Sequence, residues 1–537
     1  MRFLPVSLTV LLVELADLEE TLALFASLEA DAIAGIEDMV PAARTLMIRF
    51  RPEITDARTL ATLIARRDLS VKPAFSDRLV EVPVRYDGED LADVAALTGL
   101  SIDAVIARHT QSIFTVAFCG FAPGFGYLVG GDPVLQVPRR QTPRTKIAAG
   151  SVALGGAFCG VYPQSSPGGW QIIGTTPLKM WDITRDPPAL FQPGDRVRFI
   201  DLARHCAATP PSIATSVPDT SGQEKVEANA NAVTLEVLAA PMPALFQDAG
   251  RFGQTGQGVS SSGALDQGAF KAANRVVGNP AGTPCLEITL GSFSFRVNGR
   301  AVMALTGAPC PITIRDHAGR THSAETYQPI SLEAGDVVTL GFASCGARSY
   351  LALRGGFQVA PVLGSASTDT LAVVGPAPVV SGTILTVLPC RAAFHAVSLT
   401  EAPAFPHPSA TDVVTLDVIM GPRSDWFTEK GIATLSEQVY TVTPQSNRIG
   451  IRLSGAETLE RAITAELPSE GTATGAIQVP HSGQPVLFLA DHPLTGGYPV
   501  IANVAEYHLD LAGQIPVNAR IRFRPVTRFA AIDPAAI

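Results

Sequence analysis

Charged residues are scarce in this sequence. Asp, Glu, Lys and Arg together make up 17% of the 537 residues, well below the roughly 25% that is usual for soluble proteins. Disorder of the highly charged kind is therefore excluded. The 40 Lys and Arg against 49 Asp and Glu give a net charge of −9, without the basic stripe that nucleic acid or an anionic membrane would attract. We expect a folded protein that binds neither.

Cysteine pairs and long apolar runs are also missing. The seven cysteines occur singly, with no C-x-x-C pair, so neither a disulfide framework nor a zinc knuckle is indicated. No run approaches the about 18 apolar residues that span a bilayer. The apolar stretch at the N-terminus is interrupted by Pro5 and followed by Glu14, which favours a buried strand over a signal peptide. These features predict a reducing compartment, the cytoplasm.

Several common catalytic motifs do not occur either. The sequence has no G-x-x-x-x-G-K-[ST] loop, no G-x-S-x-G elbow, no H-E-x-x-H and no strand-linked G-x-G-x-x-G. A bound nucleotide would thus be held outside the common phosphate loops. What the sequence does have is apolar residues, 46% of the total, and a length that predicts about three or four compact units.

Strand and helix patterns alternate near the N-terminus and then give way to strands. Strand-like runs at 8–13, 45–50 and 79–85 alternate with amphipathic helical runs at 18–30 and 56–67, the pattern of a small α+β unit. Two short helices are expected at 90–97 and 102–109, the second capped by Ser101. Afterwards, short β-branched and aromatic runs separated by Gly and Pro are typical of barrels, with one longer helix at 266–277. The predicted fold class is mainly β with a small α+β N-terminal domain.

The chain divides at a segment without periodicity. Residues 206–232 are rich in Pro, Ser, Thr and Ala, which predicts a linker between two parts that fold separately. We therefore expect a small α+β domain at 1–85, a β-barrel at 86–205, the linker at 206–232, and β-barrel domains at 233–537.

Both parts contain the same three sequence elements in the same order. The first part has G-S-V-A-L from Gly150, S-P-G-G-W-Q-I-I from Ser166 and Q-P-G-D-R-V-R-F from Gln192. The second part has G-A-I-Q-V, L-T-G-G-Y-P-V-I and I-P-V-N-A-R-I-R-F at similar spacing, from Gly475 onward. Turn-plus-strand units look alike in many β proteins, but three in register favour a duplicated barrel.

The densest polar segment of the first part surrounds a loop rich in Gly and Pro. It holds four cations within eight residues, so at least one pair should face a common concavity and bind a carboxylate or phosphate; the alternative is a solvated loop. His109, at the end of a short helix, is a candidate catalytic acid or base, the alternative being a packing or capping histidine. The candidates for binding substrate or phosphate are Arg139, Arg140, Arg144, Lys146, Ser151 and Trp170.

The second part has two groups of polar candidates. Asp248 and Glu287 are candidate catalytic groups, and Arg251 is a candidate for substrate or phosphate, although an Asp248–Arg251 ion pair could simply brace a turn. Further along, polar residues occupy loop–strand junctions, where binding residues tend to lie. Because T-G-G-Y-P matches P-G-G-W-Q in the repeat, we expect the following residues to line one pocket: Asn447, Arg448, Gln478, Thr495 and Tyr498.

At these segments the sequence resembles a known family. GFAPGFGYL, PRRQTPRTKIAAGSVAL and YPQSSPGGWQIIGTTPL resemble the B-type subunit of 5-oxoprolinase, also called allophanate hydrolase subunit 1, over about 1–205. QDAGRFGQTGQGVSSSGALD, GPRSDWF, SNRIGIRLSG and SEGTATGAIQVP resemble the C-type subunit, or allophanate hydrolase subunit 2, over about 233–530. The chain thus resembles a natural fusion of both. The resemblance implies cyclophilin-like β-barrels in both halves.

The resemblance leaves three functions open. It implies a part in the ATP-dependent opening of 5-oxoproline to glutamate, with a separate A-type subunit, ATP and Mg²⁺. We expect this first function; the alternatives are the carboxyltransferase region of urea carboxylase, with biotin, and a regulator that inhibits a kinase. Under the first function, the anion would be held by Arg139, Arg140, Arg144 and Lys146. The acid, base or Mg²⁺ partners would be His109, Asp248 and Glu287. The sequence does not identify the residues that would bind a metal ion, and it does not decide whether the protein forms a homo-oligomer.

The sequence departs from the family at one segment. After V-L-G-S, where an arginine is usual, it has Ala366, and the expected glycine-rich stretch is replaced by V-G-P-A-P-V-V from Val374. The departure could remove an anion contact in the second part, which would affect activity on the usual substrate. Hydrolysis of allophanate itself is disfavoured, because the sequence lacks the G-G-S-S-G-G-S stretch of amidases.

Overall fold

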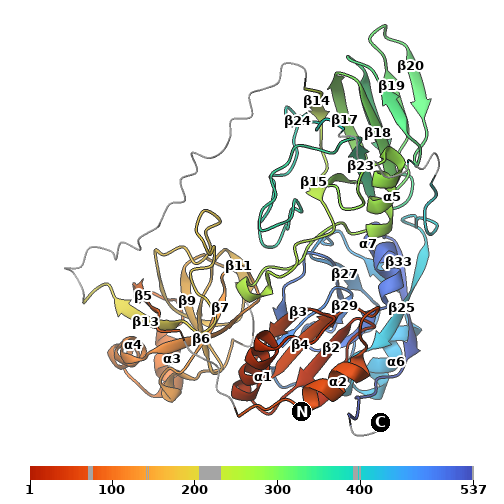
Figure 1. Ribbon diagram of the computed structural model, residues 1–537. Helices are drawn as coiled ribbons and strands as arrows, with labels where there is room; N and C mark the ends of the chain where they lie inside the picture. The colour runs from red at the N-terminus through yellow and green to blue at the C-terminus, as the bar shows by residue number, and fades with distance from the viewer. Residues whose placement is uncertain are drawn as a thin grey trace.

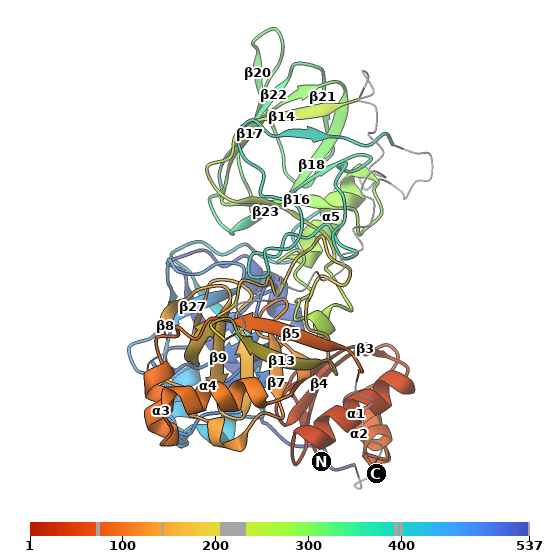
Figure 2. The same ribbon diagram turned by 90° about the vertical axis from the view of Figure 1, so that its left-hand side faces the viewer.

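The structure of the protein is a computed structural model that describes residues 1–70, 76–140, 142, 144–204, 232–390, 397 and 401–534. Strands hold more residues than helices do, and they gather into an N-terminal sheet, two barrels and a pair of facing sheets (Figure 1). Seen from the side, the first barrel lies in front, the second behind it, and the facing sheets above (Figure 2). Among the described residues no helix is long and apolar enough to cross a membrane.

The N-terminal sheet has four antiparallel strands in the order β1-β2-β4-β3. Its elements are β1 (Arg2–Pro5), β2 (Val10–Glu14), α1 (Leu18–Ala30), β3 (Ile36–Pro41), β4 (Thr45–Phe50) and α2 (Ala57–Ala65). Alternate side chains of β2 are buried on opposite faces: Leu11 and Val13 pack beneath the two helices, whereas Val10 and Leu12 pack toward the second barrel. Because side chains alternate along a strand, a run of apolar residues predicts this burial on both faces.

The two barrels share one strand order. The first runs β12-β9-β10-β7-β6-β13-β5 and the second, which is closed, runs β32-β29-β30-β27-β26-β33-β25 when read from β32. In each, the first and last strands in sequence are bonded in parallel, β5 with β13 and β25 with β33. Each barrel also carries a two-stranded ribbon, β8 with β11 and β28 with β31. The predicted duplication is confirmed.

The strands of the first barrel and its ribbon are β5 (Leu79–Val84), β6 (Phe114–Cys119), β7 (Gly126–Val129), β8 (Arg144–Ile147), β9 (Ser151–Gly155), β10 (Phe158–Val161), β11 (Ser166–Gly168), β12 (Gln171–Thr175) and β13 (Arg196–Asp201). Those of the second are β25 (Val413–Met420), β26 (Tyr440–Val442), β27 (Gly450–Ser454), β28 (Glu470–Gly471), β29 (Ala476–Gln478), β30 (Val486–Phe488), β31 (Thr495–Gly496), β32 (Val500–Val504) and β33 (Arg520–Thr527). The structure thus places 79–84, which the sequence assigned to the N-terminal unit, in the first barrel.

Residues 232–390 form a sandwich of a six-stranded and a five-stranded sheet around one core, where the sequence predicted barrels. The six-stranded sheet contains β14 (Thr234–Ala239), β17 (Gly291–Asn298), β19 (Ile312–Arg315), β20 (Thr321–Ala324), β22 (Val337–Phe342) and β24 (Ile384–Thr386). The five-stranded sheet contains β15 (Ala244–Gln247), β16 (Cys285–Thr289), β18 (Ala301–Gly307), β21 (Ile330–Leu332) and β23 (Arg348–Leu353). The period-2 pattern predicts strands but does not distinguish a barrel from a sandwich.

The predicted helices all form. Besides α1 and α2 they are α3 (Leu91–Thr98), α4 (Ile102–Gln111) and α5 (Gln267–Val277). Ser101 caps α4 by accepting a hydrogen bond from Ala104 N, as predicted. Two further helices, α6 (Glu429–Glu437) and α7 (Leu509–Gly513), were not predicted. The described residues also form short 3₁₀ turns: η1 (Pro133–Leu135), η3 (Thr255–Gln257), η4 (Ser424–Trp426) and η5 (Glu506–His508).

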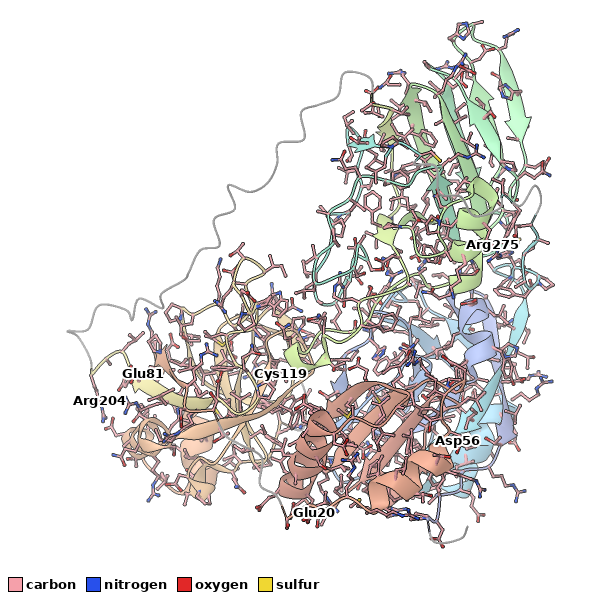
Figure 3. The ribbon with its side chains drawn as sticks, viewed as in Figure 1. Glu20, Asp56, Glu81, Cys119, Arg204 and Arg275 are labelled. Atoms are coloured by element: carbon pink, nitrogen blue, oxygen red, sulfur yellow. The ribbon has the colours of Figure 1, made fainter. Side chains whose placement is uncertain are left out.

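The two halves of the chain contact each other closely, although the predicted linker, residues 206–231 of it, lies outside the described residues. Arg423 of the second half is buried between Glu14 of the N-terminal sheet and Glu470 of β28. Gln257 of the sandwich accepts a hydrogen bond from Gly124 N of the first barrel, beside the end of β6, where Figure 3 labels Cys119. The first half therefore packs on both units of the second.

Candidate functional site

A cavity of about 470 Å³ lies between the two barrels, and both halves of the chain line it. We call it the inter-barrel cavity. The segment P-G-G-W at 167–170 forms one wall and T-G-G-Y at 495–498 forms another, so the repeated segments occupy equivalent places as the repeat predicts. Its polar and aromatic lining includes Tyr127, Arg139, Arg140, Tyr162 and Trp170 of the first half and Arg461, Glu466, Ser469, Gln478, His481, Thr495 and Tyr498 of the second.

Aromatic rings form one side of the cavity. Trp170, which is 5% exposed, meets Phe125 and Tyr127 edge to face, with ring centroids 5.4 and 5.7 Å apart. A Cβ added to Gly155 would lie 2.8 Å from the indole, so glycine is needed beneath the ring. Tyr127 Oη lies 3.2 Å from Thr495 Oγ1 of the second barrel. A flat apolar surface with polar groups at its edge is thus shared by the two barrels.

Arg139 is the cation that is held in the cavity from both sides. Its Nε lies 2.7 Å from Glu466 Oε1, its Nη2 donates to Ser469 Oγ at 3.3 Å, and its guanidinium carbon lies 5.8 Å from the Trp170 ring. A Cβ on Gly497 would lie 2.8 Å from Nη1, so the glycine makes room for the guanidinium. An arginine fixed over an aromatic ring is well suited to binding a carboxylate.

Arg140 and Arg144 are engaged by a buried carboxylate. Asp90, whose side chain is 1% exposed, accepts from Arg144 Nη1 and Nη2 at 2.8 and 2.7 Å, from Arg140 Nη1, and from Ile172 N at 2.7 Å. Burial alone would raise the pKa of Asp90, but the bonds from Arg144 and Ile172 outweigh it and lower that pKa. Arg144 therefore has a structural partner, whereas the partly exposed Arg140 also lines the cavity.

Two other candidates of the first half lie away from the cavity wall. Lys146 is exposed on β8, and Ser151 is buried at the start of β9. Neither lines the inter-barrel cavity. Of the four cations predicted near one concavity, Arg139 and Arg140 line it, Arg140 and Arg144 both donate to Asp90, and Lys146 is exposed to solvent.

His109 is a core histidine. It is fully buried on α4, its Nδ1 lies 2.8 Å from Tyr86 Oη, and its ring stacks on Phe199 with centroids 4.4 Å apart. Its Nε2 lies 3.3 Å from Cys159 Sγ, and burial lowers its pKa to about 3. His109 lines none of the cavities described and is neutral at pH 7. It is therefore a packing residue, which was the alternative considered from the sequence, and it is not placed for an acid–base role.

Asp248 and Arg251 stabilise a loop without forming an ion pair with each other. Asp248 accepts from Ser365 Oγ at 2.7 Å and Ala366 N at 2.7 Å. The buried Arg251 donates from Nε to Val362 O at 2.9 Å and from Nη2 to Ser367 O at 2.6 Å. Both side chains thus hold residues 362–367, which include Ala366, one of the two places where the sequence departs from the family it resembles. Neither lines the inter-barrel cavity.

Glu287 and Arg448 belong to a buried charge cluster that joins the sandwich to the second barrel. Arg448 donates from Nη1 to Glu287 Oε1 at 2.5 Å and from Nη2 and Nε to Asp491 at 2.9 and 3.0 Å. Tyr350 Oη donates to Glu287 Oε2 at 2.9 Å. The three charged side chains are at most 5% exposed. Each of these oxygens and nitrogens has a partner, so the cluster is structural.

The expectation of one pocket for five residues of the second half is therefore wrong in part. Gln478, Thr495 and Tyr498 line the inter-barrel cavity, but Arg448 is buried in the charge cluster. Asn447 is exposed, and its Oδ1 accepts from Ile449 N at 2.9 Å, which makes it a turn residue. The polar composition of a loop–strand junction does not reveal which side chains turn inward to a buried partner.

Sequence reasoning missed several lining residues. Arg461 and Glu466 come from a segment without a repeat, a glycine cluster or a motif, so no signal marked them, whereas Ser469 begins the S-E-G-T-A-T-G motif and could have been noticed there. His481 follows β29, and its ring lies 5.2 Å from that of Tyr498, edge to face. The V-P-H-S-G turn is a loop next to a strand, like the loop–strand junctions from which the other candidate binding residues were chosen, so the same reasoning could have found His481. His481 is the histidine that the cavity offers for proton transfer.

The described residues form no cluster of metal-binding side chains. No group of three or more His, Cys, Asp or Glu side chains among them is placed to hold one. Glu466 is the one carboxylate among the described residues that line the inter-barrel cavity, and it is paired with Arg139. Mg²⁺ binds through one or two carboxylates together with phosphates and water, and because the carboxylate of this lining is engaged by Arg139, the described lining does not fit it.

Comparison with known proteins assigns each half separately. The family model "Carboxyltransferase domain, subdomain C and D" matches residues 1–191, and "Carboxyltransferase domain, subdomain A and B" matches residues 257–525. The crystal structure of TTHA0988 is similar over nearly the whole length, with a TM-score of 0.78 and 31% identity across 96% of this chain and 99% of that one.

Curated relatives divide along the same line. The C-type subunit of 5-oxoprolinase from Escherichia coli is 34% identical over 295 residues, which are 54% of this chain and 90% of the relative. The B-type subunit of 5-oxoprolinase from Haemophilus influenzae is 48% identical over 129 residues, 24% of this chain and 61% of the relative. Urea amidolyase of Saccharomyces cerevisiae is 30% identical over 297 residues, 52% of this chain and 16% of the relative. The match thus spans less than two thirds of the last two proteins.

Proposed function

We propose, because this chain belongs to the carboxyltransferase-domain family and joins its C/D and A/B subdomains in one polypeptide, that it is the fused B-type and C-type component of an ATP-dependent 5-oxoprolinase. It would open 5-oxoproline to glutamate together with a separate A-type subunit. The observation that carries the proposal is the inter-barrel cavity. The half similar to the B-type subunit and the half similar to the C-type subunit each supply part of its lining, so a complete site needs both.

The lining suits a small cyclic amide that carries a carboxylate. Arg139 and Arg140 offer donors to the carboxylate, and Trp170 offers a flat apolar face to the ring. Gln478 donates from Nε2 to Tyr498 O at 3.3 Å, which directs the other end of its amide, an acceptor, to the lactam N–H. The ligand would be held by groups from both barrels at once.

Ring opening adds water across the lactam C–N bond. The carbonyl carbon gains the oxygen of water, the C–N bond breaks, and the nitrogen leaves with a proton. His481 is placed to move that proton, while the two arginines keep the substrate oriented. ATP, when bound, would donate its terminal phosphoryl group to the amide oxygen and so activate the carbonyl carbon, and a second water would release that group as phosphate once the ring is open. Since the described lining does not fit Mg²⁺, we assign no step to the metal here and expect the partner subunit to contribute its ligands.

The direct test is an assay for 5-oxoproline-dependent release of ADP and glutamate with the full chain and the A-type subunit of the same organism. We expect turnover only when both proteins are present. No turnover in the mixture, with biotin-dependent carboxyl transfer to urea or a related amide instead, would overturn this choice. That second function has support of its own in the family description and in the likeness to urea amidolyase.

Replacing Gly497 by alanine tests the position of Arg139 inside the cavity. Its backbone dihedral is compatible with alanine, but the new methyl would lie 2.8 Å from Arg139 Nη1, so the guanidinium must move. We expect KM for 5-oxoproline to rise by about tenfold, the cost of weakening one charged hydrogen bond, with an unchanged Tm. Gly282→Ala is the control, because nothing lies within 4 Å of the added Cβ. Equal KM values for the two variants would contradict the role of Arg139.

Three expectations from the sequence stay predictions. They are the kinase-inhibitor type of regulator, the cytoplasmic location and a homo-oligomer. A regulator acts by surface contact and does not need convergent charged groups in a concavity. The arginines and polar groups that converge in the inter-barrel cavity therefore support an enzyme component over a regulator.

A further inference from the structure

One residue in the lining of the inter-barrel cavity lies at the centre of a strained turn. Phe121 has a φ of +62°, and Ala122 N donates to Gly120 O at 2.6 Å, so residues 120–122 form a γ-turn. A γ-turn with a positive φ at its centre is rare and strained, and a bulky residue at positive φ is a backbone outlier. Of the non-glycine residues with positive φ that the structure describes, Phe121 is the one that lines this cavity.

The second half of the chain holds this turn in place. Gly120 lies against β31, since an added Cβ would lie 2.6 Å from Thr495 Oγ1. Gly258, which follows η3, also lies against the turn, since an added Cβ would lie 2.6 Å from Ala122 O. Backbone strain persists only where the surrounding structure over-determines it. The contacts from β31 and from the end of η3 therefore keep the turn from relaxing.

The Phe121 ring extends the aromatic side of the cavity. It meets Phe125 at a centroid distance of 5.3 Å and Tyr162 at 6.2 Å, both edge to face, and both of these rings line the cavity as well. Phe125 in turn meets Trp170, the ring on which the proposed function places the lactam. The Phe121 side chain is only partly buried, so core packing alone does not explain a phenylalanine where glycine would relieve the strain.

A ring on a fixed backbone limits the size of the ligand beside it. Because the turn is held by the second half, the Phe121 side chain cannot withdraw together with its loop. Apolar contacts of this kind distinguish ligands that differ by one methylene about 10- to 200-fold. The position of Phe121 thus suits a residue that selects among lactams by ring size.

We propose that Phe121 is a specificity-determining residue of the inter-barrel cavity, and that its ring restricts the apolar part of the ligand to the size of a five-membered lactam. The inference rests on the proposed function, since 5-oxoproline is the ligand in question. It adds to that function the residue that excludes larger rings.

The test is calorimetric titration of the full-length chain with 5-oxoproline and with the six-membered lactam of aminoadipate, which has one more ring methylene. We expect the wild type to bind 5-oxoproline at least about tenfold more tightly than the larger lactam. Phe121→Ala removes the ring and should reduce that preference by about fivefold or more.

The matched control is Phe158→Ala. Phe158 is also partly buried and packs on the same aromatic cluster as Phe121, but it does not line the inter-barrel cavity. Its loss removes a ring of equal size from the cluster and leaves the cavity lining intact. We therefore expect Phe158→Ala to lower the Tm and to keep the wild-type preference between the two lactams.

Thermal melting tests the strain separately. Phe121→Gly and Phe121→Ala lose the same ring, but glycine adopts a positive φ without steric cost. We expect Phe121→Gly to melt about 1–3 °C above Phe121→Ala, the reverse of the usual order of glycine and alanine. An equal or lower Tm of Phe121→Gly would contradict the strained turn. If Phe121→Ala does not fold, the preference of Phe121→Gly between the two lactams decides.

The outcomes separate this inference from the proposed function. A wild type without a preference, a Phe121→Ala chain that keeps it, or a Phe158→Ala chain that loses it equally would overturn the inference alone. The expected preferences in a chain that shows no turnover with the A-type subunit would contradict only the proposed function. Silence of the wild type towards both lactams would overturn both.

Discussion

Replacing Arg139 by alanine is expected to lower kcat/KM for 5-oxoproline by about 10- to 150-fold, the range that corresponds to one lost hydrogen bond to a charged group. Arg139 is the cation that Glu466, Ser469 and the Trp170 ring hold in place in the inter-barrel cavity, and alanine removes both its charge and its fork of donors. The measurement is steady-state ADP release with the A-type subunit present.

The control for this prediction is Lys146→Ala. Lys146 comes from the same cationic segment but is exposed on β8 and lines no part of the inter-barrel cavity, so its loss should leave kcat/KM unchanged. Arg139→Lys should fall between, because lysine keeps the charge and loses the bidentate geometry. If Lys146→Ala is as damaging as Arg139→Ala, the anion is bound outside the cavity and our assignment is wrong.

Arg448→Met should be among the most destabilising single substitutions in the chain. Burial opposes the charge of Arg448, yet Asp491 and Glu287 raise its pKa above the ordinary value, so it stays a cation. Methionine would leave the buried Asp491 without its ion-pair partner and Glu287 with Arg348 alone, 3.7 Å away, which costs about 3–5 kcal/mol. Urea unfolding monitored by tryptophan fluorescence measures the loss.

A matched surface variant gives the reference for that experiment. Arg452→Met lies on the neighbouring strand β27, where Arg452 is exposed, and should change the free energy of unfolding by less than about 0.5 kcal/mol. Adding Glu287→Gln and Asp491→Asn to Arg448→Met should restore part of the stability, since both carboxylate charges are then gone and Arg348 remains as the cation beside them. If Arg448→Met lowers the free energy of unfolding by less than about 1 kcal/mol, water must reach the cluster. That result would contradict the burial of its three charged side chains.

The sequence predicts local structure and internal repetition well because both leave periodic signals. Helix α1 forms over the residues that its apolar periodicity indicates, and Ser101 caps α4. The match of P-G-G-W to T-G-G-Y predicts that Trp170 and Tyr498 occupy equivalent positions, and both line the inter-barrel cavity. The sandwich was not predicted, since alternating strands read alike in a barrel and in two facing sheets.

The site is only partly predictable because partners distant in sequence decide what a polar side chain does. Arg140 and Arg144 look equivalent in the sequence, but Asp90, some fifty residues earlier, holds Arg144 in a bidentate pair. Arg448 similarly meets Glu287 across 161 positions. No motif records such pairs, so charge density in a segment marks a candidate region without showing which cation remains available to a ligand.

The central claim is that both halves of the chain form one substrate site, and a double-mutant cycle tests it most directly. The cycle combines Arg139→Ala from the first half with Gln478→Ala from the second and compares kcat/KM for 5-oxoproline in all four proteins. If both residues hold one ligand, their effects should deviate from additivity by at least about 0.5 kcal/mol. Two separately damaging substitutions whose effects add within about 0.3 kcal/mol would place the residues in different sites and contradict a shared one.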